Sequence, residues 1–137
     1  MLDREFRAAT LSALREAVLA AASAAGLSHD RSIEVMLAAH EVAANVVRHG
    51  SGSGRLRVRV TTLALSCQVS EARAAAIPEL AGQHQADDPA GDAPVPAAWP
   101  VKHGHGLWLV RRTADQVQVT AGPAGSVVSM TFNLPGA

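Results

Sequence analysis

Apolar residues recur with the period of an α-helix in the first part of the chain. From residue 4 to residue 25 they return at intervals of three or four, and alanine, the strongest helix former, fills most positions between them. Gly26 comes directly after this segment and suits the left-handed conformation in which many helices end. The pattern therefore predicts a helix over residues 4–25.

A second helical pattern covers residues 30–48. Ser28 or Asp30 can accept a hydrogen bond from a free amide at its start, and His49 with Gly50 follows its end. The spacing of the apolar residues predicts that one side of this helix is buried. That side consists of Ile33, Met36, Leu37, His40, Ala44 and Val47.

The period changes to that of a β-strand after the glycine- and serine-rich residues 50–54. Every second residue of 55–60 is an arginine and the residues between them are leucine or valine, so one face is buried and the other is basic. A second strand is predicted from about 63 to 70, antiparallel to the first. Its alternation groups four side chains on one face: Leu65, Cys67, Val69 and Glu71.

Residues 72–103 have neither period. Five of the seven prolines of the chain lie in this segment. Unstructured loops longer than about 12–15 residues inside a domain usually act as lids or linkers. Too little chain follows for a second domain, so the segment predicts a lid. After it, the pattern predicts a helix at about 106–114, a strand at 116–121, a turn at 122–125 and a final strand at 126–134.

The predicted order of elements is helix, helix, strand, strand, lid, helix, strand and strand. Strands that follow one another directly favour antiparallel pairing, and the helices then gather on one face of the sheet. This order indicates an α+β fold, a two-layer sandwich with a mostly antiparallel sheet. A length of 137 residues corresponds to one ordinary domain, so we expect residues 1–137 to form a single domain.

Composition and charge narrow the class of protein further. The hydrophobic fraction of 48% is too high for a disordered chain. No apolar run reaches the roughly 20 residues of a membrane span, and no leader precedes the first helix. With a single cysteine, Cys67, the sequence predicts a cytoplasmic protein with a buried, unreactive thiol. A formal net charge of zero argues against a general binder of nucleic acids or anionic membranes.

One polar pair stands out within the second predicted helix. Glu41 and Asn45 lie one turn apart and share a helix face, although their neighbours in the stretch AHEVAANVVRHG are mostly apolar. Polar residues in such a run are either exposed or held in place by partners. Taken alone, the pair is typical of the solvated edge of an amphipathic helix.

Further motifs follow the pair in a fixed order. Glu41-x-x-x-Asn45 leads into Arg48-His49-Gly50, and GHGLWLV then opens the helix after the lid, before the final strand GSVVSMTFNLP. The set resembles the N box, the second glycine box and the last strand of the histidine-kinase-like ATPase superfamily, also called GHKL or Bergerat. Within it, the chain resembles the small bacterial anti-sigma-factor serine kinases of the RsbW/SpoIIAB type. The likeness covers nearly the whole chain.

The resemblance implies roles for these residues. The asparagine matching Asn45 helps to hold Mg²⁺ against the phosphates of ATP, and the glutamate matching Glu41 is the general base that acts on the attacking hydroxyl. The second glycine box binds the phosphates through backbone amides at a helix start. Its residues here are Gly104, His105, Gly106 and Leu107. ATP and Mg²⁺ are therefore the cofactors that the resemblance implies.

The family's first glycine box, D-x-G-x-G at the end of the second strand, is altered in this chain. Its aspartate accepts a hydrogen bond from the amino group of adenine in the family, whereas the place here reads VSEARAAAIP. Strand alternation puts Glu71 at the aspartate position. Arg73 and Ala75 then occupy the two glycine positions, and side chains in the place of glycines hinder the close approach of a ligand. An alignment on Ile77 and Pro78 instead gives the three positions to Ala72, Ala74 and Ala76.

Three functions follow from the resemblance, and the third of them is an ATPase or kinase subunit of some other GHKL system. The first is an anti-sigma-type regulator that sequesters a sigma factor, or uses Mg-ATP to phosphorylate a serine of a STAS-domain anti-anti-sigma protein. The second is a pseudokinase that has lost nucleotide binding and acts only by binding such proteins. Neither of the first two implies direct contact with nucleic acid or a membrane, and relatives of this type often form homodimers. The altered first glycine box is the feature that separates the first two functions.

Overall fold

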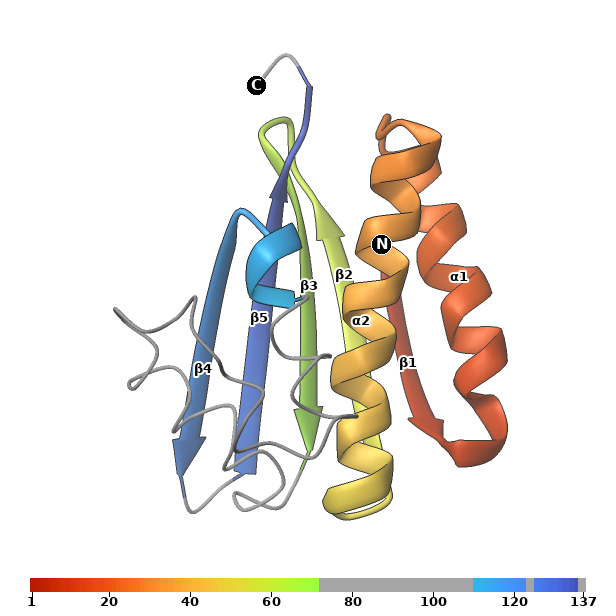
Figure 1. Cartoon of the computed structure of the whole chain (residues 1–137), viewed down its shortest axis with the longest axis vertical. Helices are drawn as coiled ribbons and strands as arrows, with labels where there is room; N and C mark the ends of the chain where they lie inside the picture. Colours follow the sequence, from red (N-terminus) through yellow and green to blue (C-terminus); the bar gives the residue numbers. More distant parts are fainter. Residues whose placement is uncertain (72–109, 123–124, 136–137) are drawn as a thin grey trace.

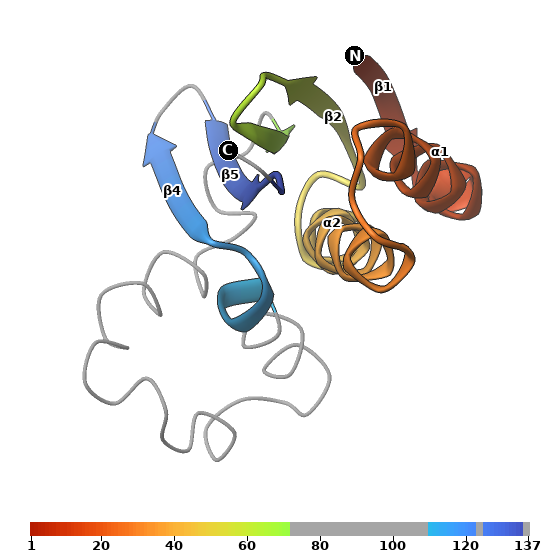
Figure 2. The same ribbon diagram turned by 90° about the horizontal axis from the view of Figure 1, so that it is seen from above.

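The computed structural model describes residues 1–71, 110–122 and 125–135. Within these ranges, five strands form one antiparallel sheet in the order β1-β2-β3-β5-β4, and two long helices cover one face of it (Figures 1 and 2). The α+β, two-layer class that the sequence predicts is confirmed. The elements are β1 (Leu2–Arg7), a 3-10 turn (Ala8–Thr10), α1 (Leu11–Ala24), α2 (His29–His49), β2 (Ser53–Val60), β3 (Ala64–Glu71), β4 (Gln116–Gly122) and β5 (Gly125–Asn133).

The predicted N-terminal helix begins too early. Leu2–Arg7 form β1, which pairs with β2, and α1 begins only at Leu11. Phe6 of β1 lies opposite Gly54 of β2 and is buried there, because Gly54 has no side chain to compete for the space. The pairing joins distant parts of the chain, so local periodicity does not reveal it. The end of α1 is as predicted, since Gly26 takes a φ of +103°.

Alternation along the central strands follows the prediction. Leu56 and Val58 of β2 are buried, while the arginines of the same strand are exposed; Val60, at the end of β2, departs from the pattern and is 44% exposed. The four predicted residues of β3 are all buried, and β5 adds three large side chains to the same layer. These residues are Leu65, Cys67, Val69 and Glu71 of β3 and Val128, Met130 and Phe132 of β5.

The buried side of α2 is rotated away from the predicted one. Ser28 caps the helix, since its hydroxyl accepts a hydrogen bond from the Arg31 amide at 3.1 Å, but Leu37 is 39% exposed. Mostly small residues face the sheet and α1, because large side chains of the sheet already fill the space between the layers. The buried residues of α2 are Ser32, Val35, Ala38, Ala39, Val42, Ala43, Ala44, Asn45 and Val46.

The C-terminal part of the chain completes the two layers. Residues 110–113 form the short helical segment that precedes β4 in Figure 2. Val110 of this segment packs into the same core as α1 and α2. β4 and β5 match the two predicted strands to within one residue at each end. The predicted lid at 72–103 and the first part of the predicted helix at 106–114 lie outside the described residues. In the described part of the chain, no helix is long and apolar enough to cross a membrane.

Candidate functional site

The predicted pair, Glu41 and Asn45, lies in the C-terminal half of α2. Arg31 precedes Asn45 by fourteen residues, close to four full turns, so these two residues lie on roughly the same side of the helix, and Glu41 lies further round it. The Arg31 guanidinium donates to the carbonyl of Thr113 at 2.6 Å, which turns this side of α2 toward the helical segment 110–113. Asn45 therefore lies on roughly the same side of α2 as the contact between Arg31 and Thr113.

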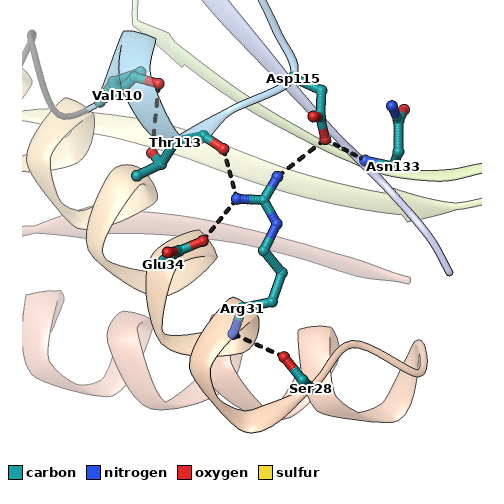
Figure 3. A network of polar contacts seen from close by, with 7 residues as sticks. All are labelled: Ser28, Arg31, Glu34, Val110, Thr113, Asp115 and Asn133. Atoms are coloured by element: carbon teal, nitrogen blue, oxygen red, sulfur yellow. Dashed lines mark hydrogen bonds and ion pairs between the residues drawn. The ribbon is translucent and has the colours of Figure 1, made fainter.

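Arg31 joins three parts of the fold at the N-terminal end of this side (Figure 3). Its Nη1 donates to Glu34 Oε1 at 2.7 Å as well as to Thr113, and its Nη2 donates to Asp115 Oδ2 at 3.0 Å. Asp115 Oδ2 also accepts from the backbone amide of Asn133 at 2.7 Å. Carbonyls of a last helical turn lack partners within their helix. Arg31 supplies one for Thr113, and so fixes the end of the segment 110–113 against α2 and β5.

Asn45 lies further along the same side, near the C-terminal end of α2. It is 5% exposed, and its Oδ1 has no hydrogen-bond partner among the described residues. Leaving a buried acceptor unpaired costs about 1–3 kcal/mol. Its buried neighbours Val42 and Val46 offer no donor from their side chains. Glu41, one turn earlier, is half-buried, so its carboxylate keeps access to the surroundings of the helix.

Glu71 ends β3 on the helix-facing side, where strand alternation predicts it, and it is 7% exposed. Its Oε1 accepts two hydrogen bonds from Ser51, one from the backbone amide at 3.2 Å and one from the hydroxyl at 3.0 Å. Its Oε2 is buried and has no partner in the ranges that the structure describes. Ser51 follows Gly50, the C-cap of α2, so this contact attaches the end of β3 to the end of α2 (Figure 1).

An open hollow of about 770 Å³ lies at this end of the sheet. Residues at the ends of β1, β2, β3 and β5 line it, together with the loop after α2. The lining includes Ser51 and Glu71 but neither Glu41 nor Asn45. Glu71 is thus beside open space, while the two residues of the N-box pair are not among those that line the hollow.

Two further groups have shifted pKa values, the half-buried His40 and the buried Cys67. Burial lowers the pKa of His40 below its usual range, and the charge of Arg15 lowers it further. The Nδ1 atom of His40 is also buried without a partner among the residues described. Cys67 is buried at the centre of the sheet as predicted, and burial raises the pKa of its thiol to about 12. Because the thiolate is the reactive form, this shift suppresses the reactivity of Cys67.

Part of the predicted site lies outside the described residues. Ser51, by contrast, is a site residue that the sequence analysis missed, because a serine within GSGSG has the local pattern of an ordinary loop. The described ranges contain no group of three or more His, Cys, Asp or Glu side chains arranged to hold a metal ion. The predicted site residues that lie outside the described ranges are Gly104, His105, Gly106 and Leu107, and also Ala72, Ala74 and Ala76 of the second alignment.

Comparison with known families agrees with the fold. The family model for the histidine kinase-like ATPase domain matches residues 5–132, a range that begins within β1 and ends within β5. No curated protein shows significant similarity to the chain. The match covers more than half of the chain, and the antiparallel sheet with helices on one face is consistent with this family. The chain therefore belongs to the family of histidine kinase-like ATPase domains.

Proposed function

We propose that this protein is an ATP-dependent regulator of the anti-sigma type. It binds Mg-ATP and phosphorylates a serine of a STAS-domain anti-anti-sigma protein, sequesters a sigma factor, or does both. The observation that carries the proposal is the buried Oδ1 of Asn45, which has no protein partner in the described part of the chain. Such an atom costs stability unless a ligand completes its contacts. The ATPase family supplies the class of that ligand.

The amide of Asn45 fits a magnesium ion bound together with a nucleotide. Mg²⁺ is usually held by one or two protein oxygens, several waters and phosphate oxygens, so it does not require a cluster of carboxylates. The Oδ1 atom is an oxygen ligand of this type, and it is buried and unpaired among the described residues. When bound, the ion neutralises charge on the β- and γ-phosphates. Asn45 is thus the residue that we expect to hold it.

Glu41 is the general base in this proposal. It lies one turn before Asn45 on the same side of α2 and is half-buried. In the transfer step, the partner's serine oxygen bonds to the γ-phosphorus while the bond from that phosphorus to the bridging oxygen breaks. ADP leaves with the electron pair of the broken bond, and Glu41 accepts the proton of the serine hydroxyl. Phosphoryl transfer depends mainly on positioning and charge neutralisation, so few side chains suffice.

Calorimetric titration with ATP and MgCl₂ tests the binding step. We expect the wild type to bind, Asn45→Ala to lose binding, and Asn45→Asp, which keeps an oxygen at this position, to retain part of it. Asn133→Ala is the matched control, because the interaction described for Asn133 uses only its backbone amide. Unfolding midpoints of all variants separate loss of binding from loss of fold. Binding by Asn45→Ala equal to the wild type would contradict the role of this residue.

Transfer of label from γ-labelled ATP to a STAS-domain partner tests the chemical step. Glu41→Gln removes the base but keeps the size of the side chain, so we expect it to bind ATP and to transfer no label. Identification of a phosphoserine on the partner establishes the acceptor. Label transfer by Glu41→Gln at the wild-type rate would exclude Glu41 as the base.

A pseudokinase is the second candidate, and the sequence after Glu71 favours it. Residues 72–76 contain no glycine, so the close backbone approach to a nucleotide that glycines allow is not encoded there. This candidate predicts that neither the wild type nor Asn45→Ala binds ATP, while a sigma factor or STAS protein still binds stoichiometrically. Replacing Glu71, Arg73 and Ala75 by Asp, Gly and Gly should then create affinity for ATP.

A further inference from the structure

We propose that the outer edge of β4, the side of this strand that lies away from β5, is an interface between two copies of the chain. In this interface the two β4 strands pair antiparallel about a two-fold axis at Val119 and join the two sheets into one. The inference goes beyond the proposed function and does not depend on it, because the pairing needs no nucleotide. It rests on the position of β4 in the sheet, on its sequence and on the faces that its residues occupy.

β4 ends the sheet on one side and β1 ends it on the other (Figures 1 and 2). β4 pairs with β5, and no strand in the described part of the chain pairs with its opposite edge. The backbone amides and carbonyls along such an edge form a template for another strand. A strand of a second molecule can therefore add to β4 through main-chain hydrogen bonds.

The two edges of the sheet differ in how they are protected from this pairing. Four of the six residues of β1 are charged, and Arg55 forms ion pairs with two of them, Asp3 at 2.7 Å and Glu5 at 3.5 Å. Charged side chains on an edge strand oppose the addition of another strand. β4 has the sequence QVQVTAG, with no charged residue and no proline. Of the two edges, β4 is therefore the one that can accept a second copy.

The sequence of β4 is compatible with itself in antiparallel pairing. Val117 and Val119 are half-buried and pack against the core, so Gln116, Gln118 and Thr120 alternate onto the opposite face, where they are exposed. A two-fold axis at Val119, perpendicular to the sheet, keeps every residue on its own face and pairs β4 along its whole length. Each Gln118 then lies opposite Thr120 of the second copy, and Val119 lies opposite its own equivalent.

These cross-strand pairs suit one another chemically. A glutamine amide both donates and accepts hydrogen bonds and so does a threonine hydroxyl, so Gln118 and Thr120 of the second copy can bond across the axis. The two copies of Val119 extend the apolar layer and cover surface that one molecule leaves half-exposed. An axis moved to Val117 would instead bring Asp115 opposite Val119, although the Asp115 carboxylate already accepts from Arg31 at 3.0 Å.

The pairing closes at two copies. A two-fold axis uses the β4 edge of each molecule, and the joined sheet then ends at both sides in the charged β1. The contact consists mainly of two strands of seven residues, which is small beside the interfaces of permanent dimers. We therefore expect a reversible equilibrium between monomer and dimer, and no growth into longer assemblies.

Sedimentation equilibrium of the full chain over a series of concentrations, without nucleotide, tests the inference. Gln118→Lys combined with Thr120→Lys places like charges opposite each other and should raise the dissociation constant of the dimer at least about tenfold. Gln118→Lys combined with Thr120→Glu differs in the sign of one charge. It should dimerise at least as well as the wild type, because each introduced lysine then faces an introduced glutamate of the second copy.

Gln68→Lys is the matched control. Gln68 and Gln118 lie on either side of Ser129 in the register of the sheet, and both are exposed on the same face, but Gln68 belongs to the central strand β3. Its substitution should leave the dissociation constant unchanged. Unfolding midpoints of all variants show that the fold is retained.

The outcomes decide the inference without reference to nucleotide binding. A wild type that stays monomeric at every concentration overturns it and leaves the proposed function in place, as does a dimer that the two introduced lysines do not weaken. Equal weakening by Gln68→Lys, or a failure of the lysine–glutamate variant to dimerise, overturns the assigned edge or its two-fold axis. A reversible wild-type dimer, its loss with two lysines and its return with lysine and glutamate together support the interface.

Discussion

The polar groups at the two ends of α2 differ in whether they have hydrogen-bond partners. At the N-terminal end, Arg31 donates to three acceptors and lies 5.2 Å from the centre of the Phe132 ring. At the C-terminal end, Asn45 Oδ1 and Glu71 Oε2 are buried and, within the described ranges, have no partner. Satisfied polar networks stabilise a fold and unsatisfied ones weaken it. The first end holds the structure together, whereas the second end has buried acceptors, one of which, Asn45 Oδ1, the proposed function assigns to a ligand.

Removal of Arg31 should have the largest effect on stability. Arg31→Ala loses the hydrogen bonds to Thr113 and Asp115 and leaves their oxygens to water, so we expect a loss of about 2 kcal/mol in the free energy of unfolding. Arg31→Lys keeps the charge but cannot reach several acceptors at once, and should lose about half as much. Urea unfolding measures both. A loss in Arg31→Ala that is smaller than in Asn45→Ala would contradict the contrast between the two ends.

Cys67 provides an independent readout of the same effect. Because burial raises the pKa of its thiol to about 12, the native protein should not react with an aromatic disulfide reagent at pH 8, and labelling should follow opening of the sheet. A loss of about 2 kcal/mol corresponds to a labelling rate about 30 times higher in Arg31→Ala. Rapid labelling of the native wild type would show that the thiol is accessible after all.

The opposite sign is expected at the other end of the helix. Asn45→Leu replaces a buried amide, whose oxygen has no partner in the residues described, with an apolar side chain of similar size. We expect unfolding to become harder by about 1 kcal/mol, while binding of Mg-ATP is lost. Thermal or urea unfolding and calorimetry, carried out on one preparation, measure the two effects. A destabilised Asn45→Leu would mean that the amide makes contacts that stabilise the free protein.

A smaller effect is expected from His40 near the middle of α2. Its pKa is lowered in the folded state by burial and by Arg15, so the unfolded chain takes up a proton first as the pH falls. Stability should therefore be complete above the pKa of about 6.5 that the unfolded histidine has, and should decline as the pH drops below it. His40→Gln should flatten this decline between pH 7 and pH 5. His29→Gln, at an exposed position of the same helix, should not.

The sheet could be predicted from the sequence where one face is buried, because alternation of two residues then reports the fold directly. This holds for β2, β3 and β5, and it also placed Glu71 on the correct face. β1 was not predicted because the burial of Phe6 depends on pairing with Gly54, which is far away in the sequence. The buried side of α2 was misjudged because close packing against a sheet of large side chains selects alanines.

The candidate site was predictable only as far as its motif is local. Glu41 and Asn45 are a pair one turn apart, and this spacing can be read from the sequence. The contact of Ser51 with Glu71 could not be predicted from the local sequence, because it depends on how the end of α2 packs beside the end of β3. Contacts between elements of this kind arise from the packing of the whole fold.

The glycines after α2 are not an interchangeable spacer, although their composition resembles that of flexible linkers used in protein engineering. Gly52 has a φ of +92°, and a Cβ atom on Gly54 would lie 2.6 Å from the carbonyl oxygen of Ser70 and 2.7 Å from Cζ of Phe6. Each glycine therefore has its own geometric requirement. A library that randomises this loop, or a graft that lengthens it, should keep both glycines so that the hydrogen bonds from Ser51 to Glu71 are retained.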